Sequence, residues 1–287
     1  MGKKGISTHK NGENIARIKK CHFLQESMEN RVTDDVLGLF FDQFKRPHKT
    51  PLHMSAIQRR LEDKHSFWVV SDALKKLVED NILMTEARDT NNSSSVHFYY
   101  PTNLDISPTE MSSKIKNIVT QIDRYSSPRN TSVLGNYLHA LVRRELKVHR
   151  FKIIDENTNS YGDKKGEDGK QDLDIIAEHE IKGIKVGVEI KNTLDVIEKE
   201  EILSKTQLCK DLRLIPIFAC RWLEPYKEEI RSKGGFPWQF KWQIYPIGRE
   251  KRVNEIRRRF GFPVAVMSEI PEESVKEFET WIASFNQ

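Results

Sequence analysis

Two short segments hold the residues of this chain whose types and spacing could do chemistry. Asp174 lies in the run Asp-Leu-Asp-Ile-Ile, and Glu189 and Lys191 lie in the run Val-Glu-Ile-Lys that follows it. Two converging carboxylates supply the hard oxygen ligands that Mg²⁺ prefers, and the bound ion can polarise a phosphate and acidify a water molecule. A lysine ammonium beside them can stabilise negative charge that builds on phosphoryl oxygens. The combination indicates metal-assisted hydrolysis of a phosphodiester.

A strand period brings these side chains to one face. In the second segment polar residues alternate with apolar ones, so Glu189 and Lys191 project from the same side of a strand. If a two-residue turn lies at 181–182, antiparallel pairing sets Asp174 opposite Glu189. If it lies at 182–183, Asp174 faces Lys191 instead. Both registers leave the three groups within reach of one ion.

An alternating strand with Glu and Lys two residues apart is also common on a solvent-facing sheet, and the spacing alone has a high false-positive rate. The surrounding elements narrow the choice. The patterns predict, in chain order, a helix at 132–147, a strand at 148–154, a polar loop, strands at 172–180 and 183–191, a helix at 195–212 and an apolar strand at 214–219. This α/β alternation predicts a mixed sheet flanked by helices.

The order of elements over residues 132–220 resembles the PD-(D/E)xK nuclease superfamily. Residues 173–176 and 188–191 are similar to its two signature strands. The resemblance implies hydrolysis of nucleic-acid phosphodiesters that depends on Mg²⁺, with Mn²⁺ as a substitute. It also implies the site roles: metal ligation by Asp174, Glu189 and the carbonyl of Ile190, and catalysis by Lys191.

The chain departs from the pattern of that family at two places. No proline precedes Asp174, and Asp172 is a rival carboxylate two residues earlier on the same face. Relatives often carry a glutamate on the preceding helix, where this chain has His139. Glu145 is a second candidate for that role, although a surface glutamate is the simpler interpretation.

The helix after the Glu-x-Lys strand carries Lys205 and Gln207 where related nucleases often have polar residues facing the site. We include Gln207 among the candidate catalytic residues. An exposed glutamine on a helix needs no special explanation, so the alternative stays open.

The first hundred residues predict a separate module. Helices are expected at 33–44, 51–61 and 66–81, and strands at 82–87 and 96–100 joined by a polar turn. Three helices and a hairpin over residues 33–102 resemble a winged helix-turn-helix, a fold that binds DNA or another protein. If it binds DNA, the third helix would enter the major groove. The expected contacts are then Ser66, Trp68, Ser71 and Lys75 on that helix and Arg88 in the wing.

The remaining segments complete the predicted division of the chain. Residues 1–32 form a basic arm that either tracks phosphates or is simply solvated. Residues 33–105 form the winged-helix domain, 106–131 a linker helix and loop, and 132–287 the nuclease domain. The linker helix carries a narrow apolar seam that either forms a short coiled-coil dimer contact or packs against the chain itself: Met111, Ile115, Ile118 and Ile122.

Two patterns mark the end of the chain. Aromatic residues alternate over 236–244 and predict one strand, whose stripe is more often a core face than a surface for base stacking. A helix ahead of Gly261 carries the densest basic cluster, which is either a phosphate-contacting surface or a solvated helix face. The cluster's candidate DNA contacts are Arg257, Arg258 and Arg259.

Composition sets wider limits. The chain has 287 residues, of which 37% are hydrophobic and 31% charged, so it is long enough for two domains. A net charge of +5 favours a polyanionic partner only mildly. Three cysteines without Cys-x-x-Cys spacing argue against a disulfide framework and a structural zinc site, which predicts a reducing compartment. No apolar run approaches the roughly 18 residues of a membrane span.

These observations together predict a two-domain α/β protein, in which a winged helix-turn-helix precedes a restriction-endonuclease-like mixed sheet flanked by helices. We expect a cytoplasmic or nucleoid-associated endonuclease that cuts double-stranded DNA as a homodimer, because two active sites are needed to cut both strands. A restriction-type enzyme is the first interpretation, and a structure-selective resolvase or repair nuclease is the second. The rival from another class is a DNA-binding regulator whose nuclease fold is inactive.

Overall fold

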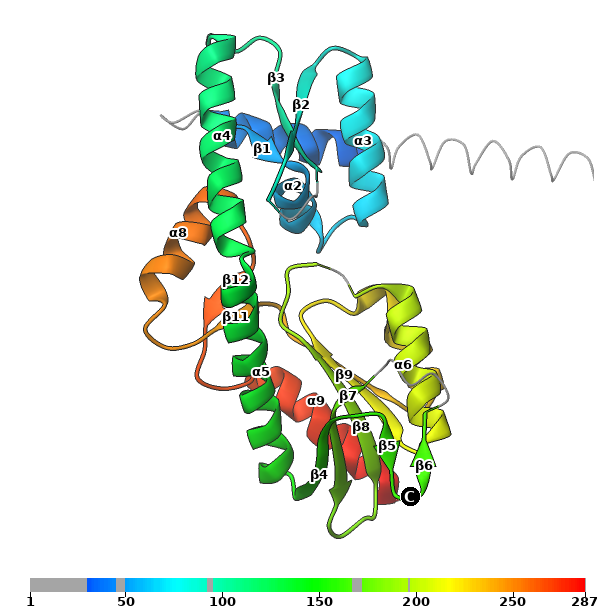
Figure 1. Cartoon of the computed structure of the whole chain (residues 1–287). Coiled ribbons are helices and arrows are strands. Elements are labelled where there is room, and N and C mark those ends of the chain that lie inside the picture. Colours follow the sequence, from blue (N-terminus) through cyan, green and yellow to red (C-terminus); the bar gives the residue numbers. More distant parts are fainter. Residues whose placement is uncertain (1–29, 45–49, 92–94, 167–171, 196, 287) are drawn as a thin grey trace, which may run out of the picture. The chain divides into compact units, whose positions relative to one another are not determined.

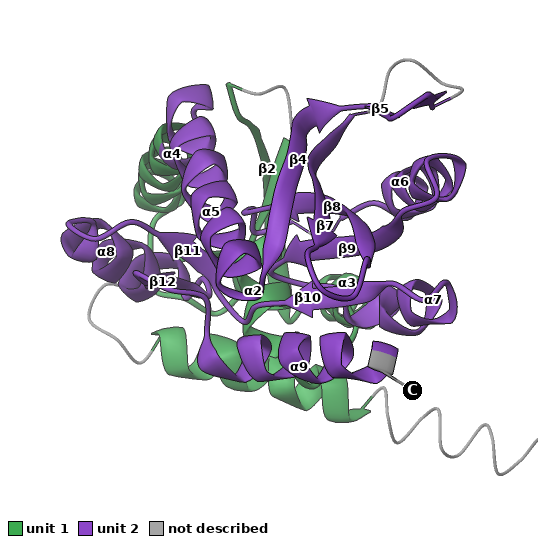
Figure 2. Cartoon of the chain, turned by 90° about the horizontal axis from the view of Figure 1, so that it is seen from below, with its two compact units in different colours: residues 1–124 green, residues 125–287 purple. Residues whose placement is uncertain are grey.

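The computed structural model describes residues 30–44, 50–91, 95–166, 172–195 and 197–286 (Figure 1). The chain divides into two compact units, residues 1–124 and 125–287 (Figure 2). The boundary therefore falls inside the predicted linker at 106–131. The predicted basic arm at 1–32 lies outside the described residues, except for its last three positions.

The first unit contains a helix over residues 30–44 and nearly all of the helix α4. Its other elements are β1 (Leu52–His53), α2 (Met54–Leu61), α3 (Phe67–Glu79), β2 (Leu83–Asp89) and β3 (Ser95–Pro101), and α4 runs over Pro108–Tyr125. The strands form an antiparallel sheet in the order β1-β3-β2. Three helices followed by a hairpin are thus present in the predicted order. The one change is β1, where pairing with β3 overrides the helical pattern predicted from residue 51.

Amphipathic helices build the core of this unit. The helix over 30–44 buries Val32, Val36 and Phe40, which recur every four residues. The predicted apolar face of α3 is confirmed, because Val70, Ala73, Leu74 and Leu77 are buried and Val78 packs against the same cluster. The first turn of α4 is capped by Ser107, because the Glu110 backbone N–H donates to Ser107 Oγ at 3.2 Å.

The apolar seam of α4 is covered within the chain itself. Met111, Ile115 and Ile118 are buried, and Ile122 is half-buried. Of the two alternatives for this seam, packing against the chain itself is therefore confirmed. The coiled-coil contact is wrong, because a seam already buried in one chain offers no apolar stripe to a second copy.

The second unit is an α/β arrangement around a mixed sheet. Its elements are α5 (Pro128–Val148), β4 (Phe151–Thr158), β5 (Ser160–Tyr161), β6 (Lys164–Lys165), β7 (Leu173–His179), β8 (Lys185–Lys191), α6 (Lys199–Asp211), β9 (Ile215–Cys220), η1 (Glu224–Tyr226), α7 (Lys227–Ser232), β10 (Phe236–Gln239), β11 (Gln243–Tyr245), α8 (Glu250–Phe260), β12 (Val264–Val266), α9 (Glu272–Ala283) and η2 (Ser284–Asn286). Five strands form the sheet in the order β10-β9-β8-β7-β4. The pairs β4–β7 and β7–β8 are antiparallel, and β8–β9 and β9–β10 are parallel, so the predicted mixed sheet is confirmed.

Apolar side chains cover both faces of this sheet, and α5 and α6 lie on opposite sides of it (Figure 2). One face packs Val186, Val188 and Ile217 against side chains of α5 and α9. On the other face, Ile176 packs against Leu208 and Cys209 of α6. Strand β9 contributes to both, as its continuous apolar run predicts.

Several predictions of where elements begin, end or divide in this unit were wrong. Helix α5 begins at Pro128 inside the predicted loop, because proline suits the first helical turn. Strand β4 extends to Thr158, into the segment predicted as a polar loop. The aromatic stripe at 236–244 is two strands, β10 in the large sheet and β11 paired with β12, and its members Trp238 and Phe240 are buried in the core.

Candidate active site

The register of β7 and β8 brings the acidic residues together. Ile175 pairs with Val188, and the same register continued by one residue sets Asp174 opposite Glu189. This is the first of the two predicted registers. The connection is longer than a two-residue turn, because the backbone N–H of Gly183 donates to the carbonyl of His179 at 2.9 Å. Gly183 adopts φ +65°, a left-handed conformation that glycine accepts without strain.

A glycine also lets α6 approach β8 closely. A Cβ placed on Gly187 would lie 2.7 Å from Cys209 Sγ of α6 and 2.7 Å from Leu173. With no side chain there, the helix packs directly over the strand. Because side chains alternate along β8, Glu189 and Lys191 lie on the same face as Gly187, toward α6.

Each carboxylate of the pair has a specific partner. Asp174 Oδ2 accepts a hydrogen bond of 2.6 Å from the backbone N–H of Ile190. The Lys205 ammonium of α6 lies 2.8 Å from Glu189 Oε2 and also donates to the carbonyl of Asp172. Glu189 is only 6% exposed, so the alternative of a solvent-facing strand is wrong at this position.

Lys191 is held by a second residue of α6. Its ammonium lies 2.5 Å from Glu201 Oε1, and both side chains are partly exposed. Glu201 and Lys205 are four residues apart, so they share one face of the helix. The site therefore alternates in charge, with Glu189 facing Lys205 and Lys191 facing Glu201.

Burial makes the acid pair electrostatically unusual. Burial, followed by the charge of nearby Asp174, raises the pKa of Glu189 from 4.5 to about 7, although Lys205 opposes this shift. Burial also raises the pKa of Asp174, against the hydrogen bond from Ile190 and the charges of Lys205, His139 and Lys191. The two carboxylates therefore interact electrostatically, as two groups that could share one cation must. Perturbed carboxylates of this kind are typical of functional sites.

The structure decides several of the predicted roles. Ile190 contacts Asp174 through its N–H, and the ligand role of its carbonyl stays a prediction. Gln207 is wrong as a site residue, because it is exposed and donates to Asp211 Oδ1 at 2.7 Å, one turn further along α6. The residue of α6 that reaches the site is Lys205, two positions earlier. The helical period explains why Lys205 and not Gln207 reaches the site. Lys205 is four residues before Cys209, which faces β8.

The three other candidate site residues, Asp172, His139 and Glu145, lie at different distances from the acid pair. Asp172 is exposed and contributes its carbonyl, not its carboxylate, to the contact with Lys205. His139 Nε2 lies 3.4 Å from the carbonyl of Asp174, so this part of α5 does border the site. Glu145 is buried beside His149 at 3.4 Å and forms no described contact with the acid pair.

Sequence reasoning missed Asn192, which anchors the end of β8. Its side-chain Nδ2 donates to the carbonyls of Leu134 at 2.8 Å and Ile244 at 2.7 Å, and its Oδ1 accepts from the N–H of Ile244 at 2.9 Å. The Gln243 side chain donates to the carbonyl of Asn192 at 2.9 Å. This buried residue joins α5, β8 and β11, and its position one residue after Lys191 was the available signal.

The predicted DNA contacts of the first unit fall into two groups. Trp68 is 64% exposed, and Lys75 is exposed beside Glu79. Ser71 is wrong as an outward contact, because its hydroxyl donates to the carbonyl of Phe67 at 2.9 Å and accepts from the Gln58 side chain at 3.0 Å. Ser66 is half-buried at the start of α3.

Arg88 lies on β2, where the wing was predicted. Its guanidinium donates to Ser112 Oγ of α4 at 3.0 Å and forms an ion pair with Glu86. The side chain is nevertheless partly exposed. A contact with phosphate at this position stays a prediction.

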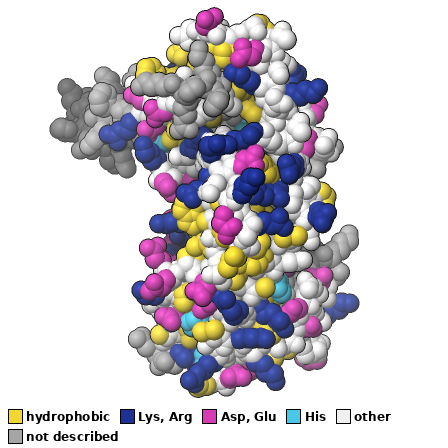
Figure 3. All heavy atoms as spheres, turned by 90° about the vertical axis from the view of Figure 1, so that its left-hand side faces the viewer, with side chains coloured by type: hydrophobic (Ala, Val, Ile, Leu, Met, Phe, Trp, Pro, Cys, Tyr) yellow, Lys and Arg dark blue, Asp and Glu magenta, His cyan; other side chains and the backbone are white. Residues whose placement is uncertain are grey.

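The predicted basic helix is confirmed as α8, which ends at Phe260 and is capped by Gly261 with φ +68°. Arg257, Arg258 and Arg259 are exposed, and Lys and Arg side chains gather with interspersed acids on the face of the molecule shown in Figure 3. Arg257 lies over the Trp242 ring at 5.4 Å, and Arg259 pairs with Glu255 at 3.4 Å. The helix therefore presents cations that structural contacts hold in place.

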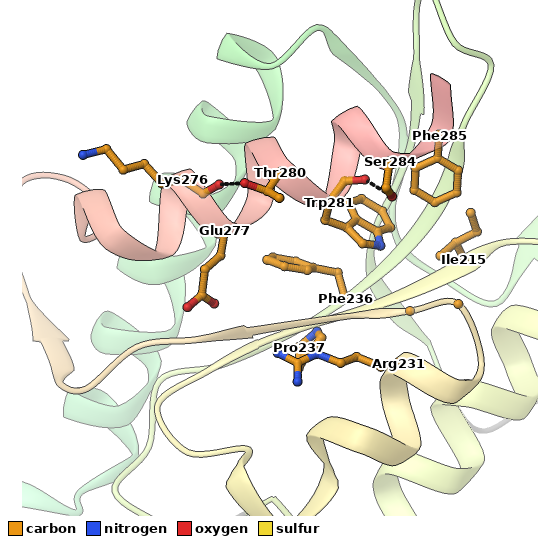
Figure 4. A pocket seen from close by; sticks show the side chains of 12 residues that line it. Ile215, Arg231, Phe236, Pro237, Lys276, Glu277, Thr280, Trp281, Ser284 and Phe285 are labelled. Carbon is orange, nitrogen blue, oxygen red and sulfur yellow. Dashed lines mark hydrogen bonds between the residues drawn. The ribbon is translucent and has the colours of Figure 1, made fainter. Parts of the chain in front are cut away.

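A separate pocket of about 790 Å³ lies beside β10, α7 and α9 (Figure 4). Phe236 and Trp281 stack along it with ring centroids 5.3 Å apart. Its cations are already paired within their own helices, Arg231 with Glu228 and Lys276 with Glu272. None of the acid pair or its lysines lines this pocket.

The acid pair fits a magnesium ion in donor type and number. Mg²⁺ is commonly bound by one or two carboxylates, with water and substrate phosphate completing its coordination. Among the described residues no group of three or more His, Cys, Asp or Glu could hold a metal ion, so Asp174 and Glu189 would be the only carboxylate ligands drawn from them. No described helix is long and apolar enough to cross a membrane. No family model, curated protein or solved structure matches the chain.

Proposed function

We propose that this protein is a metal-dependent DNA endonuclease of the PD-(D/E)xK type, which hydrolyses phosphodiester bonds. The observation that carries the proposal is the pair of half-buried Asp174 on β7 and buried Glu189 on β8, with the Lys191 ammonium at the end of β8. Two carboxylates that repel each other where burial shields them from water destabilise a fold unless a cation compensates them. A structural role alone gives no reason to retain both.

The residues divide the chemistry between them. Asp174 and Glu189 would hold Mg²⁺, which supplies Lewis acidity toward a phosphate and a water molecule when it is bound. The N–H of Ile190 fixes the orientation of the Asp174 carboxylate. Glu201 holds the Lys191 ammonium at the end of the strand, where it can stabilise the charge that develops on phosphoryl oxygens.

The rest of the chain supports DNA as the substrate. The first unit has the order of helices and strands of a winged helix-turn-helix, and the exposed Trp68 and Lys75 of α3 are available to a DNA groove. The exposed arginines of α8 offer a second phosphate-contacting surface on the unit that contains the acid pair. A DNA-docking module joined to a cleavage module favours a restriction-type enzyme. A homodimer, which would cut both strands, remains part of this proposal.

The second candidate is a DNA-binding regulator without catalytic activity. The position of Lys205 favours the regulator. Its ammonium lies 2.8 Å from Glu189 Oε2, and this positive charge could permanently take the place of a metal ion. The same DNA-binding surfaces would serve this function.

The test is cleavage of supercoiled, linear and four-way-junction DNA with and without Mg²⁺ or Mn²⁺. Glu189→Gln and Lys191→Met should each lower the rate by at least about a hundredfold while DNA binding persists, because each removes transition-state stabilisation. Matched controls are Glu180→Gln and Lys185→Met, which change exposed residues of the same hairpin. Wild-type protein that binds this panel and never cuts it would establish the regulator instead. Preferential cutting of the junction would make the enzyme a resolvase.

A further inference from the structure

The ammonium of Lys205 stands beside the acid pair where a cationic ligand is expected. It lies 2.8 Å from Glu189 Oε2, and it also donates to the carbonyl of Asp172. Its positive charge favours the ionised form of Asp174 as well. The side chain is 13% exposed, so this contact is largely shielded from water.

A divalent cation held by Glu189 would compete with this ammonium for the same carboxylate oxygen. Two positive charges at one carboxylate repel each other strongly in a buried site, where water screens little. Lysine has a flexible four-carbon stem, so the ammonium can move while α6 keeps its place. The carbonyl of Asp172 offers it a partner outside the acid pair.

We propose that Lys205 is a built-in counter-cation of the acid pair, which leaves Glu189 when a divalent metal ion binds and thereby weakens metal affinity. This inference rests on the proposed metal-dependent function and deepens it. The ammonium stabilises the metal-free protein by compensating the buried Glu189 and the half-buried Asp174. A second consequence is that half-saturation of the site needs a higher metal concentration than it would without Lys205.

The first test is calorimetric titration of the full chain with MnCl₂ in the absence of DNA. Lys205→Gln removes the charge but keeps a hydrogen-bond donor, and it should bind Mn²⁺ about tenfold more tightly, a change of about 1.4 kcal/mol. Lys210→Gln, at an exposed position of the same helix, is the matched control and should bind as the wild type does. Equal or weaker binding by Lys205→Gln would overturn the inference.

A second measurement uses the wild-type chain and does not depend on the folding of a variant. An amine-acetylating reagent is applied with and without saturating Mn²⁺, and modified lysines are quantified by mass spectrometry. Displacement from Glu189 should raise acetylation of Lys205 several-fold, while Lys210 in the same sample stays constant. An unchanged Lys205 contradicts the inference.

The outcomes separate this inference from the proposed function. If wild type and Lys205→Gln bind Mn²⁺ equally well and the wild type cuts DNA, only the inference fails. If neither binds Mn²⁺, the metal-dependent function fails and the inference fails with it. If Lys205→Gln alone binds Mn²⁺, the inference holds in its strongest form, and the non-catalytic regulator becomes the better description of the wild type.

Discussion

Among single residues, Glu189 shows how burial changes the chemistry of an ordinary side chain. On an exposed strand, a glutamate and a lysine two residues apart would form a solvated ion pair, and such a pair contributes little to stability or function. Here the carboxylate is buried beside Asp174, and its pKa is raised to about 7. The charge of this group therefore changes near neutral pH.

This shift predicts how stability depends on pH in metal-free buffer. The folded protein keeps a proton on Glu189 between pH 4.5 and about 7, where the unfolded chain has released it. The contribution of this group to stability is therefore greatest below pH 4.5, and it declines as the pH rises through about 7. Thermal unfolding of wild type and Glu189→Gln should be compared from pH 5 to 8.

The expected result is that the wild type loses stability relative to Glu189→Gln across this range. The exposed Glu180→Gln serves as the control and should show a constant difference from wild type. A constant difference for Glu189→Gln as well would mean that the carboxylate titrates normally, which would contradict the raised pKa of Glu189.

Among the elements, the close contact of α6 with β8 assembles the site. Gly187 leaves no room for a side chain, so Cys209 packs directly against the strand. The helix then carries Lys205 to Glu189, one turn before Cys209, and Glu201 to Lys191, two turns before Cys209. A larger residue at Gly187 would move both partners away from β8.

The end of β8 depends in turn on Asn192, which predicts the effect of removing its side chain. Asn192→Ala leaves the buried carbonyls of Leu134 and Ile244 and the N–H of Ile244 without their partner. An unsatisfied buried polar group costs about 1–3 kcal/mol, so we expect a loss of roughly 3 kcal/mol in the free energy of unfolding. Urea denaturation measures this change.

The exposed Asn254→Ala is the control for this variant and should change stability by less than about 0.5 kcal/mol. If the two variants are equally stable, Asn192 does not anchor the strand. In that case the position of Lys191 must depend on the sheet alone.

At the scale of the whole molecule, the proposed function requires two compact units to bind one DNA substrate. Each unit carries its own candidate DNA surface, α3 in the first and α8 in the second. Phosphate contacts contribute affinity that falls steeply with salt, whereas base contacts contribute specificity. The change in salt dependence when the charges of α8 are altered therefore reports on the phosphate contacts of that helix.

Reversing the charges of Arg257, Arg258 and Arg259 to glutamate should flatten the dependence of DNA affinity on salt. Each phosphate contact adds about 0.9 to the slope of log affinity against log salt, so the loss should be about 2 to 3. Fluorescence anisotropy with duplex DNA measures it. The matched control reverses Arg231, Lys233 and Lys276, which are exposed on or next to α7 and on α9. If the slope of log affinity against log salt is the same in all three proteins, α8 does not contact DNA phosphates.

Local patterns were enough to predict most elements and the pairing of the acidic strands. The alternation in β8 placed Glu189 and Lys191 on one face, and a short connection to β7 restricted Asp174 to two registers. The apolar face of α3 and the helix that ends at Gly261 followed from the helical period and from a glycine stop. These features depend on neighbours in the chain, so the sequence by itself determined them.

Only the tertiary structure decided which residues complete the site. Lys205 and Gln207 are two positions apart on α6, and the pattern could not tell which faces the sheet until Cys209 was seen to pack on Gly187. The pairing of β1 with β3, the burial of the α4 seam and the bonds of Asn192 likewise join residues far apart in sequence. Burial and long-range contact are properties of the folded chain, because they depend on which surfaces meet.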